Sequence, residues 1–183
     1  MFARKRIRSA KKTTSRYFNR KIIEKKIRQA PKEGLKCCDL LNILGGSKNF
    51  IGVFAANHLL NLKIYSYPIF LICNIDESFE SGSHWLAMRI SKYEIEIFDS
   101  LGFLTELWGK KSPSLSKFLD RFRLTHKFKF SPVLQSSESS SCGLFSVFYI
   151  RNRQSFSFKQ CCNFFSKNLY LNDRKLLSYF LSK

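Results

Sequence analysis

Two short segments that alternate apolar and polar residues lie close together in the middle of the chain. They are HWLAMRI, residues 84–90, and EIEIFDS, residues 94–100, with only three residues between them. Alternation with a period of two is the pattern of a β-strand, and so short a gap favours an antiparallel hairpin. We therefore expect two neighbouring strands, with residue 84 opposite residue 99 or 100.

The segments on either side of this hairpin predict both strands and helices. Strands are expected at residues 68–75 and 126–134, and helices at 38–44, 115–122, 142–152, 156–169 and 173–181. Ser114 is the expected N-cap of helix 115–122, and QSSESSS, residues 135–141, is expected to be a polar loop. This order of elements indicates the α+β class, with a central, mostly antiparallel sheet packed against helices.

Cys142 stands where a polar loop meets an apolar helix. Residues 142–152, CGLFSVFYIRN, are apolar on nearly all sides, which is typical of a buried helix, and Gly143 adds no bulk beside the thiol. The free N–H groups and the dipole of a helix N-terminus stabilise a thiolate. Cys142 is therefore a candidate nucleophile, although a buried structural thiol is the commoner interpretation of position alone. No comparable setting surrounds the other cysteines, Cys37, Cys38, Cys73, Cys161 and Cys162.

A cysteine hydrolase also needs a base and a group that orients the base. Among the three histidines, His58, His84 and His126, we rank His84 first, because it opens a strand directly after a turn. Asp99 ends the next strand, so the predicted hairpin places its carboxylate beside His84. The alternative is that Asp99 only begins an Asx-type turn.

Taken together, these motifs resemble the adenovirus-type (adenain-like) cysteine proteases, especially those of Polinton/Maverick elements and related DNA viruses. The resemblance covers roughly residues 43–150 and includes NFIGVFAANHL (49–59) and NIDESFESGSHW (74–85). Its specific parts are, in chain order, His84-Trp85, Asp99 in FDSLGF, Gln135, and Cys142-Gly143 in SSSCGLF. His84-Trp85 or Cys142-Gly143 alone is a weak signal, but all four parts in this order form a specific pattern.

The resemblance implies a papain-like/Ulp-type protease arrangement and a role for each matching residue. Cys142 is then the nucleophile, His84 the base and Asp99 the group that orients it. Gln135 donates its side-chain amide to the oxyanion, beside the backbone N–H of Cys142. Asp99 departs from the adenovirus enzyme, which has Glu there, and Asn57 stands where many relatives carry an acid.

Positive charge is concentrated at the N-terminus. The chain has 32 Lys and Arg against 13 Asp and Glu, a net charge of +19, and residues 1–28 hold twelve of the basic residues and one acid. Self-repulsion predicts a basic, largely disordered arm over residues 1–28, with a short helix at 17–27, before a protease domain over residues 29–183. Pro31 and Gly34 mark this boundary. Excess positive charge indicates polyanionic partners, so DNA contacts are expected at the arm's basic residues, including Arg4, Lys5, Arg6, Arg8, Lys11 and Lys12. The same run of charge also fits a nuclear-localisation signal, and a solvated tail without a partner is the alternative to both functions.

The leading hypothesis is a cysteine endopeptidase that cleaves viral or mobile-element capsid or core precursors during virion maturation. Two alternatives stay open: a Ulp-type protease that removes ubiquitin-like modifiers, and a basic DNA-binding protein without catalysis. We expect no required cofactor, with DNA as a candidate stimulating polyanion, and zinc is disfavoured because no CxxC pair occurs.

The expected partners are precursor polypeptides and DNA, and the resemblance also allows an activating peptide. We expect a monomer inside the cell, in the host nucleus or the virion. The N-terminus lacks the apolar segment of a secretory signal, and no apolar run approaches the ~20 residues of a membrane span.

Overall fold

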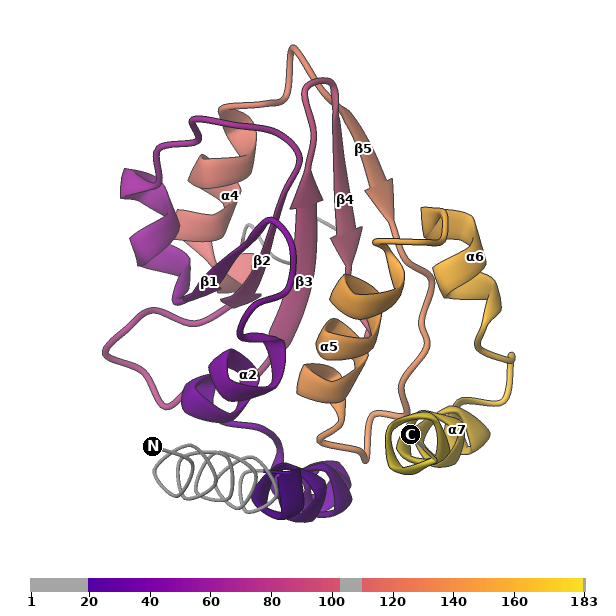
Figure 1. The fold of residues 1–183 in the computed structure, drawn as a ribbon. Coiled ribbons are helices and arrows are strands. Elements are labelled where there is room, and N and C mark those ends of the chain that lie inside the picture. The colour runs from indigo at the N-terminus through magenta and orange to yellow at the C-terminus, as the bar shows by residue number, and fades with distance from the viewer. Residues whose placement is uncertain (1–19, 103–109, 183) are drawn as a thin grey trace, which may run out of the picture.

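The computed structural model describes residues 20–102 and 110–182 of the chain. Five strands form one sheet in the order of the sequence: β1 (Phe50–Phe54), β2 (Ile69–Asn74), β3 (Trp85–Ile90), β4 (Glu94–Phe98) and β5 (Lys127–Phe130) (Figure 1). The three central strands are antiparallel, whereas β1 pairs with β2, and β5 with β4, in parallel. The sheet is therefore mixed around an antiparallel centre, and the predicted α+β class is confirmed.

The predicted hairpin is also confirmed, with a small shift in register. Ala87 pairs with Phe98 and Ile90 with Ile95. Continued beyond the strand ends, this register puts residue 84 opposite residue 101 rather than 99 or 100. His84 and Asp99 lie just outside the ladder, so the contacts of the adjoining loops, and not strand pairing, determine where their side chains meet.

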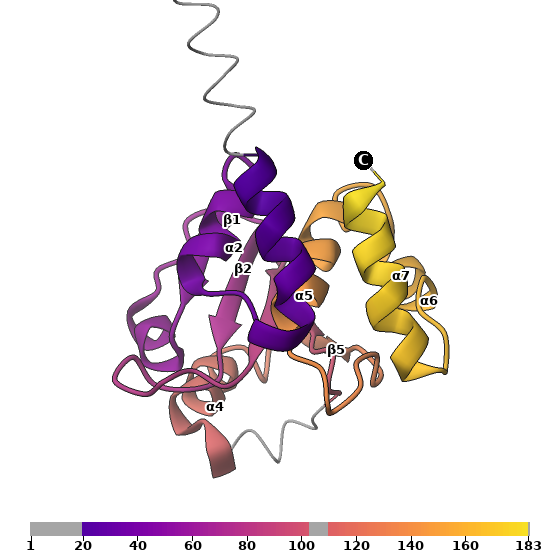
Figure 2. The ribbon, with the colours of Figure 1, turned by 90° about the horizontal axis from the view of Figure 1, so that it is seen from below.

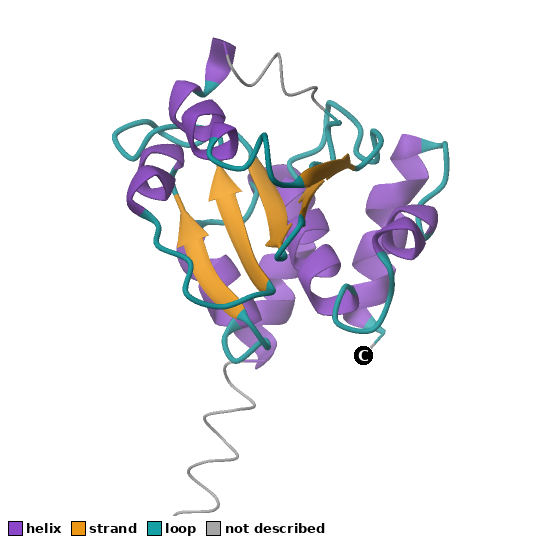
Figure 3. Ribbon diagram, turned by 90° about the horizontal axis from the view of Figure 1, so that it is seen from above, coloured by secondary structure: helices purple, strands orange, loops and turns teal. Residues whose placement is uncertain are grey.

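Helices cover both faces of the sheet (Figure 3). One face carries α2 (Cys37–Leu44), α5 (Cys142–Asn152), α6 (Phe158–Asn163), α7 (Leu169–Leu181) and the helical residues 20–33. The other carries η1 (Ala56–Asn61) and α4 (Pro113–Asp120). Strand side chains alternate between the two layers: Phe70 and Ile72 join the core with α5, while Ile69 and Leu71 join the core with α4. Burial on both faces makes the sheet a rigid base for its loops.

The helix that begins at Cys142 lies at the centre of the larger core. Its residues 142–150 are all buried, and α5 contacts β3, α2 and α7. Figure 2 shows α5 flanked by helix 20–33 and by α7. The Tyr149 ring stacks on Phe98 of β4, with ring centroids 4.7 Å apart. Each such fully buried large side chain stabilises the fold by about 1.5–3 kcal/mol relative to exposure, so the position of α5 is strongly determined.

The basic arm differs from its prediction where the structure describes it. Residues 20–33 form one helix that runs past residue 28 and through Pro31, and it ends at Gly34, whose φ is +71°. Its apolar side packs into the core, with Ile27 and Ala30 buried. This burial explains why the helix crosses the expected boundary between arm and domain. Arg4, Lys5, Arg6, Arg8, Lys11 and Lys12 lie outside the described residues.

Four other predicted elements, α4, β5, α6 and α7, differ clearly in their ends. The N-cap of α4 is Ser112, not Ser114, because Pro113 takes the first helical position, where its missing N–H costs nothing. β5 covers only residues 127–130 of the expected 126–134.

The other two differences concern the C-terminal helices. Helix 156–169 shortens to α6, and α7 begins at residue 169 rather than 173. Side-chain caps explain both starts, since Ser157 accepts from the Gln160 N–H and Asn168 accepts from the Leu171 N–H. Among the described helices, none combines the length and apolar character needed to cross a bilayer.

Candidate active site

His84 and Asp99 meet at one end of the β3–β4 hairpin. The His84 side chain precedes β3 and Asp99 follows β4, and the distance from His84 Nε2 to Asp99 Oδ1 is 2.7 Å. Both residues are buried, with exposed fractions of 4% and 2%. The His84 carbonyl accepts from the Ile75 N–H at 3.1 Å, which ties the start of β3 to the end of β2. The structure thus brings together the predicted base and its predicted orienting group.

Asp99 is held by its own turn and by the segment after β5. Asp99 Oδ1 also accepts from the Leu101 N–H at 3.0 Å, which is the Asx-type contact that the sequence left as an alternative. The Ser131 hydroxyl donates to the Asp99 carbonyl at 2.6 Å and accepts from the Asp99 N–H at 2.9 Å. The Asx turn and the histidine contact coexist, because one carboxylate oxygen can accept two hydrogen bonds.

Cys142 is the third member of this group. It is the first residue of α5, is 7% exposed, and shares a side-chain hydrogen bond with His84. Because Nε2 of His84 faces Asp99, Nδ1 is the ring nitrogen left for the sulfur. Burial lowers the pKa of His84, but the hydrogen bonds to Asp99 and Cys142, and the negative charge of both groups, raise it to about 9. The imidazolium form is therefore favoured at neutral pH beside the sulfur.

The segment before α2 packs on the start of α5. A Cβ at Gly143 would lie 3.0 Å from Leu35 Cβ, which is tighter than most such contacts, so a larger residue there would have to displace Leu35 slightly. The indole N–H of Trp85 donates to the Leu35 carbonyl at 2.8 Å, and the Ser140 N–H donates to the Pro31 carbonyl at 3.0 Å. The Trp85 hydrogen bond therefore holds the segment before α2 beside the site. The sequence contained no signal for the contribution of Leu35.

Gln135 lies buried in the loop that leads to Cys142, with an exposed fraction of 2%. Its Oε1 accepts from the Ser100 hydroxyl at 2.6 Å, and its Nε2 donates to the Ser139 carbonyl at 2.5 Å. Its backbone N–H donates to the Ser100 carbonyl at 2.9 Å. The amide group therefore belongs to one connected set of contacts that joins the Asp99–Ser100 turn to the loop before Cys142.

Two residues of α7 hold the same loop from the other side. The Asn172 side-chain amide, fully buried, donates to the Leu134 carbonyl at 2.8 Å, and the Ser139 hydroxyl donates to Asp173 Oδ1 at 2.8 Å. These partners are 34 and 38 positions apart in the chain, so no local sequence pattern pointed to them.

The remaining histidines and cysteines have other surroundings. His126 is hydrogen bonded to Thr125 and to the Ser91 carbonyl, and His58 belongs to η1. Burial raises the pKa of Cys161 to about 11 and that of Cys162 to about 12, and it also raises the pKa of Cys73. These three groups therefore remain thiols at neutral pH. Within residues 20–102 and 110–182, no three His, Cys, Asp or Glu side chains are grouped as a metal site needs.

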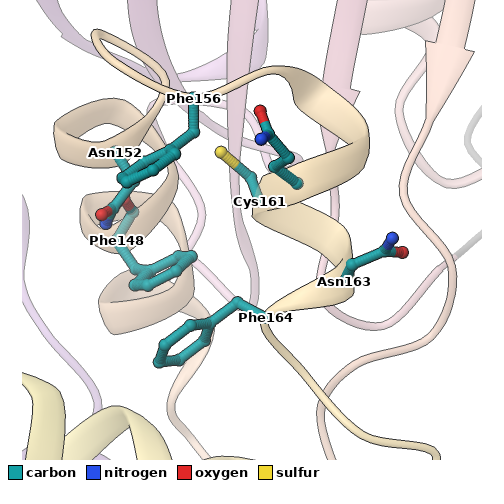
Figure 4. A pocket seen from close by; sticks show the side chains of 7 residues that line it. Phe148, Asn152, Phe156, Cys161, Asn163 and Phe164 are labelled. Atoms are coloured by element: carbon teal, nitrogen blue, oxygen red, sulfur yellow. The ribbon is translucent and has the colours of Figure 1, made fainter.

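A small pocket of about 280 Å³ opens between the C-terminal part of α5 and α6 (Figure 4). It is lined by Phe148, Asn152, Phe156, Gln160, Cys161, Asn163 and Phe164. Its α5 residues come six and ten positions after Cys142, or roughly 9 and 15 Å along a helix axis. The pocket is therefore separate from the His84–Asp99–Cys142 group.

The group at the start of α5 has a recognisable chemical arrangement. An α+β domain holds a buried cysteine at a helix N-terminus, hydrogen bonded to a histidine that is itself hydrogen bonded to a carboxylate. This is the arrangement that thiol hydrolases use.

Comparison with known proteins finds similarity among solved structures. The ASFV pS273R protease matches with a TM-score of 0.46 and 16% sequence identity, over 77% of this chain and 62% of the other. A second structure of the same ASFV protease, containing selenomethionine, matches with a TM-score of 0.37 and 22% identity, over 64% of this chain and 45% of the other. The chain thus spans about 62% of the length of the first of these proteins. No family model matches the chain, and no curated protein has a significantly similar sequence.

Proposed function

We propose that the chain is a cysteine endopeptidase in which Cys142 is the nucleophile. One observation carries the proposal: Cys142, His84 and Asp99 are buried and hydrogen bonded in that order at the N-terminus of α5. A structural thiol has no need of a histidine whose pKa is raised to about 9, after the opposing effect of burial, by hydrogen bonds to a carboxylate and to that thiol.

The first half of the reaction makes a thioester. Cys142 Sγ attacks the carbonyl carbon of the scissile peptide, a C–S bond forms, and the carbonyl π electrons move to oxygen. Two donors stabilise this oxyanion: the Cys142 N–H and one amide hydrogen of Gln135. The Cys142 N–H is available because N–H groups in the first turn of a helix lack intrahelical partners. The oxyanion then collapses, the C–N bond breaks, and His84 gives its proton to the leaving amine nitrogen.

The second half releases the other product. Water attacks the thioester carbon while neutral His84 takes its proton. Collapse of the new oxyanion breaks the C–S bond, and the thiolate and the imidazolium are restored as the carboxylic acid leaves. Asp99 remains hydrogen bonded to Nε2 throughout, which orients the ring and stabilises its charged form.

The proposed substrates are structural precursors of a virus or mobile element, cleaved in the host nucleus or the virion during maturation. The support is the ordered set His84-Trp85, Asp99, Gln135 and Cys142-Gly143, which resembles the adenovirus-type proteases. Removal of ubiquitin-like modifiers uses the same chemistry on another substrate and is the alternative that the substrate test distinguishes.

The test compares the wild-type chain with Cys142→Ala and with Cys161→Ala, which removes another buried thiol outside the site. Each variant is co-expressed with the structural precursors. Each purified variant is also incubated with a library of internally quenched peptides and with a panel of ubiquitin-like conjugates. Peptide and precursor cleavage should fall by a factor of at least about 10⁴ in Cys142→Ala and stay within a few-fold of wild type in Cys161→Ala. Persistent cleavage by Cys142→Ala rejects the nucleophile, and cleavage of conjugates alone rejects the endopeptidase assignment.

A second activity, DNA binding, is favoured by the outer side of helix 20–33. Lys21, Lys25, Arg28 and Lys32 are exposed and follow one another at helical spacing, opposite the buried Ile27 and Ala30. A row of four cations on a helix anchored to the core can follow a phosphate backbone. All four residues of this row lie in the part of the chain that the structure describes. Their proposed DNA contacts are additional to those expected at the six basic residues between Arg4 and Lys12.

The corresponding experiment measures affinity for duplex DNA over a series of salt concentrations. Changing all four residues of the row to Gln should reduce the slope of log K against log salt by about 3 to 4, because each phosphate contact contributes about 0.9. A control variant with Lys48, Lys63, Lys159 and Lys167 changed to Gln removes the same charge elsewhere on the exposed surface. Equal slopes for the two variants reject a specific role of helix 20–33.

A further inference from the structure

The amide group of Gln135 is held by a hydrogen bond at each end. The Ser139 carbonyl, 2.5 Å from Nε2, can only accept a hydrogen bond, so it requires the NH₂ end of the amide. The Ser100 hydroxyl, 2.6 Å from Oε1, donates to the opposite end. With Oε1 and one amide hydrogen engaged in this way, the second hydrogen of Nε2 keeps a defined direction.

We infer that Ser100 is a positioning residue for the oxyanion site and acts through Gln135. The inference rests on the proposed function, and it adds a role that the motif residues do not include. An amide turned by 180° would present its oxygen where the donor is needed, and oxygen would repel the developing negative charge. The Ser139 carbonyl excludes this flipped orientation, because two acceptor oxygens would then face each other, and the Ser100 hydroxyl holds the correctly oriented amide in position through Oε1.

Ser100 also connects this function to the histidine. It directly follows Asp99, and its carbonyl accepts from the N–H groups of both Leu134 and Gln135, at 2.8 Å and 2.9 Å. Two consecutive residues therefore orient the base and the oxyanion donor from one short turn. Ser100 is 1% exposed, so water does not readily replace its hydroxyl if that group is lost.

A purely structural role for Ser100 predicts different behaviour. If its hydroxyl only satisfied a buried amide, its loss would lower stability without a selective effect on turnover. If it orients the oxyanion donor, its loss lowers kcat for peptide hydrolysis. KM changes little, because the oxyanion exists only in the transition state and the tetrahedral intermediate.

The experiment uses a reaction of the same thiol that forms no oxyanion. Alkylation by iodoacetamide joins carbon to Cys142 Sγ and releases iodide, with no tetrahedral intermediate. Ser100→Ala should lower kcat on the best quenched peptide by roughly tenfold, less than the ~100-fold or larger loss typical when an oxyanion donor is removed outright. The alkylation rate of Cys142 should stay within twofold of wild type. Ser112→Ala is the control, since its buried hydroxyl has no hydrogen-bond partner among the described residues.

A double-mutant cycle then tests whether Ser100 acts through Gln135. In a Gln135→Ala background, Ser100→Ala should change kcat by less than twofold, because there is no amide left to orient. A further tenfold loss in that background overturns the inference, and so does wild-type kcat in Ser100→Ala alone. An equal loss of hydrolysis and alkylation also overturns it, because that result indicates damage to the thiol–histidine pair.

The same measurements separate this inference from the proposed function. A wild-type chain that is alkylated at Cys142 yet cleaves no peptide refutes both. A wild-type chain that cleaves peptides, with Ser100→Ala fully active, refutes only the role of Ser100. If Ser100→Ala does not fold, Ser100→Cys keeps a weak donor of similar size, and a loss of about threefold that disappears in Gln135→Ala is expected instead.

Discussion

The buried carboxylate of Glu96 allows a sharp prediction about stability. Glu96 lies on β4, fully buried, and accepts hydrogen bonds from Arg153 at 2.8 Å and 2.9 Å and from the Tyr149 hydroxyl at 2.5 Å. Tyr149 belongs to α5, and Arg153 is the residue directly after the end of α5. The group therefore joins the strand that leads to Asp99 to the helix that begins at Cys142. The perturbation is Glu96→Ala.

The magnitude follows from what the substitution leaves behind. Removing one partner of a buried ion pair costs about 3–5 kcal/mol, and the lower end applies because the Arg153 side chain is 19% exposed and can be partly hydrated. The buried Tyr149 hydroxyl also loses its acceptor, at about 1–3 kcal/mol. Because one carboxylate serves both groups, these costs overlap, and we expect a loss of about 4 kcal/mol in the free energy of unfolding.

Urea unfolding at pH 7, followed by circular dichroism, measures this loss. Glu94→Ala is the matched control, since Glu94 lies on the same strand and pairs with Lys129 in a partly exposed salt bridge, and its loss should cost less than about 1 kcal/mol. A Glu96→Ala variant destabilised by under 1.5 kcal/mol, or by no more than Glu94→Ala, refutes the reasoning. A typical domain has only about 5–15 kcal/mol of stability, so the expected effect is easily measured.

Three further predictions concern the site. Burial lowers the pKa of His84, but hydrogen bonds to Asp99 and Cys142 raise it to about 9. A histidine whose pKa is higher in the folded state than in the unfolded state stabilises the fold. This stabilisation is complete below the unfolded pKa of about 6.5 and is lost as the pH rises through 9. Urea titrations from pH 6 to 10 should therefore show wild type losing about 3 kcal/mol that His84→Ala does not lose, and parallel curves would contradict this. Asp99→Ala should lower kcat about 10- to 100-fold less than His84→Ala, measured on one peptide, and an equal or larger loss would contradict an orienting role. Gly102→Ala should cost about 2–3 kcal/mol, because Gly102 has a φ of +65° and a Cβ there would lie 2.8 Å from the Val133 backbone nitrogen. Gly46→Ala, with a φ of +84° and nothing within 4 Å, should cost only about 1 kcal/mol, so similar losses in the two variants would show that crowding at Gly102 is unimportant.

Much of the fold was predictable where a local pattern had one physical solution. The apolar run after the serine loop predicted α5 at residues 142–152, and the structure has the same bounds. The alternating segments predicted the β3–β4 hairpin, because an antiparallel pair with a short connection is the simplest way to satisfy their hydrogen bonds. Helix 20–33 extended beyond its prediction because tertiary packing buries Ile27 and Ala30.

Alternation was a poorer guide to burial. In EIEIF the glutamates occupy the positions that alternation assigns to solvent, yet Glu96 is fully buried, since helices cover both faces of the sheet. Its partner Arg153 lies 57 positions away, and a long-range ion pair of this kind leaves no periodic signal in the sequence.

The amino-acid sequence by itself determined which residues form the candidate site. The order of His84, Asp99, Gln135 and Cys142, and the start of an apolar helix at Cys142, follow from residue types and short-range spacing, which local backbone preferences convert into strands and helix ends. Tertiary structure alone decided how these groups are held. The contacts that hold them join residues 34 to 108 positions apart. They are the Ser100 hydrogen bond to Gln135, the close approach of Leu35 to Gly143, and the hydrogen bonds of Asn172 and Asp173 to the loop before Cys142. Such contacts depend on how helices and sheet pack against one another, and packing is a property of the whole chain rather than of any segment.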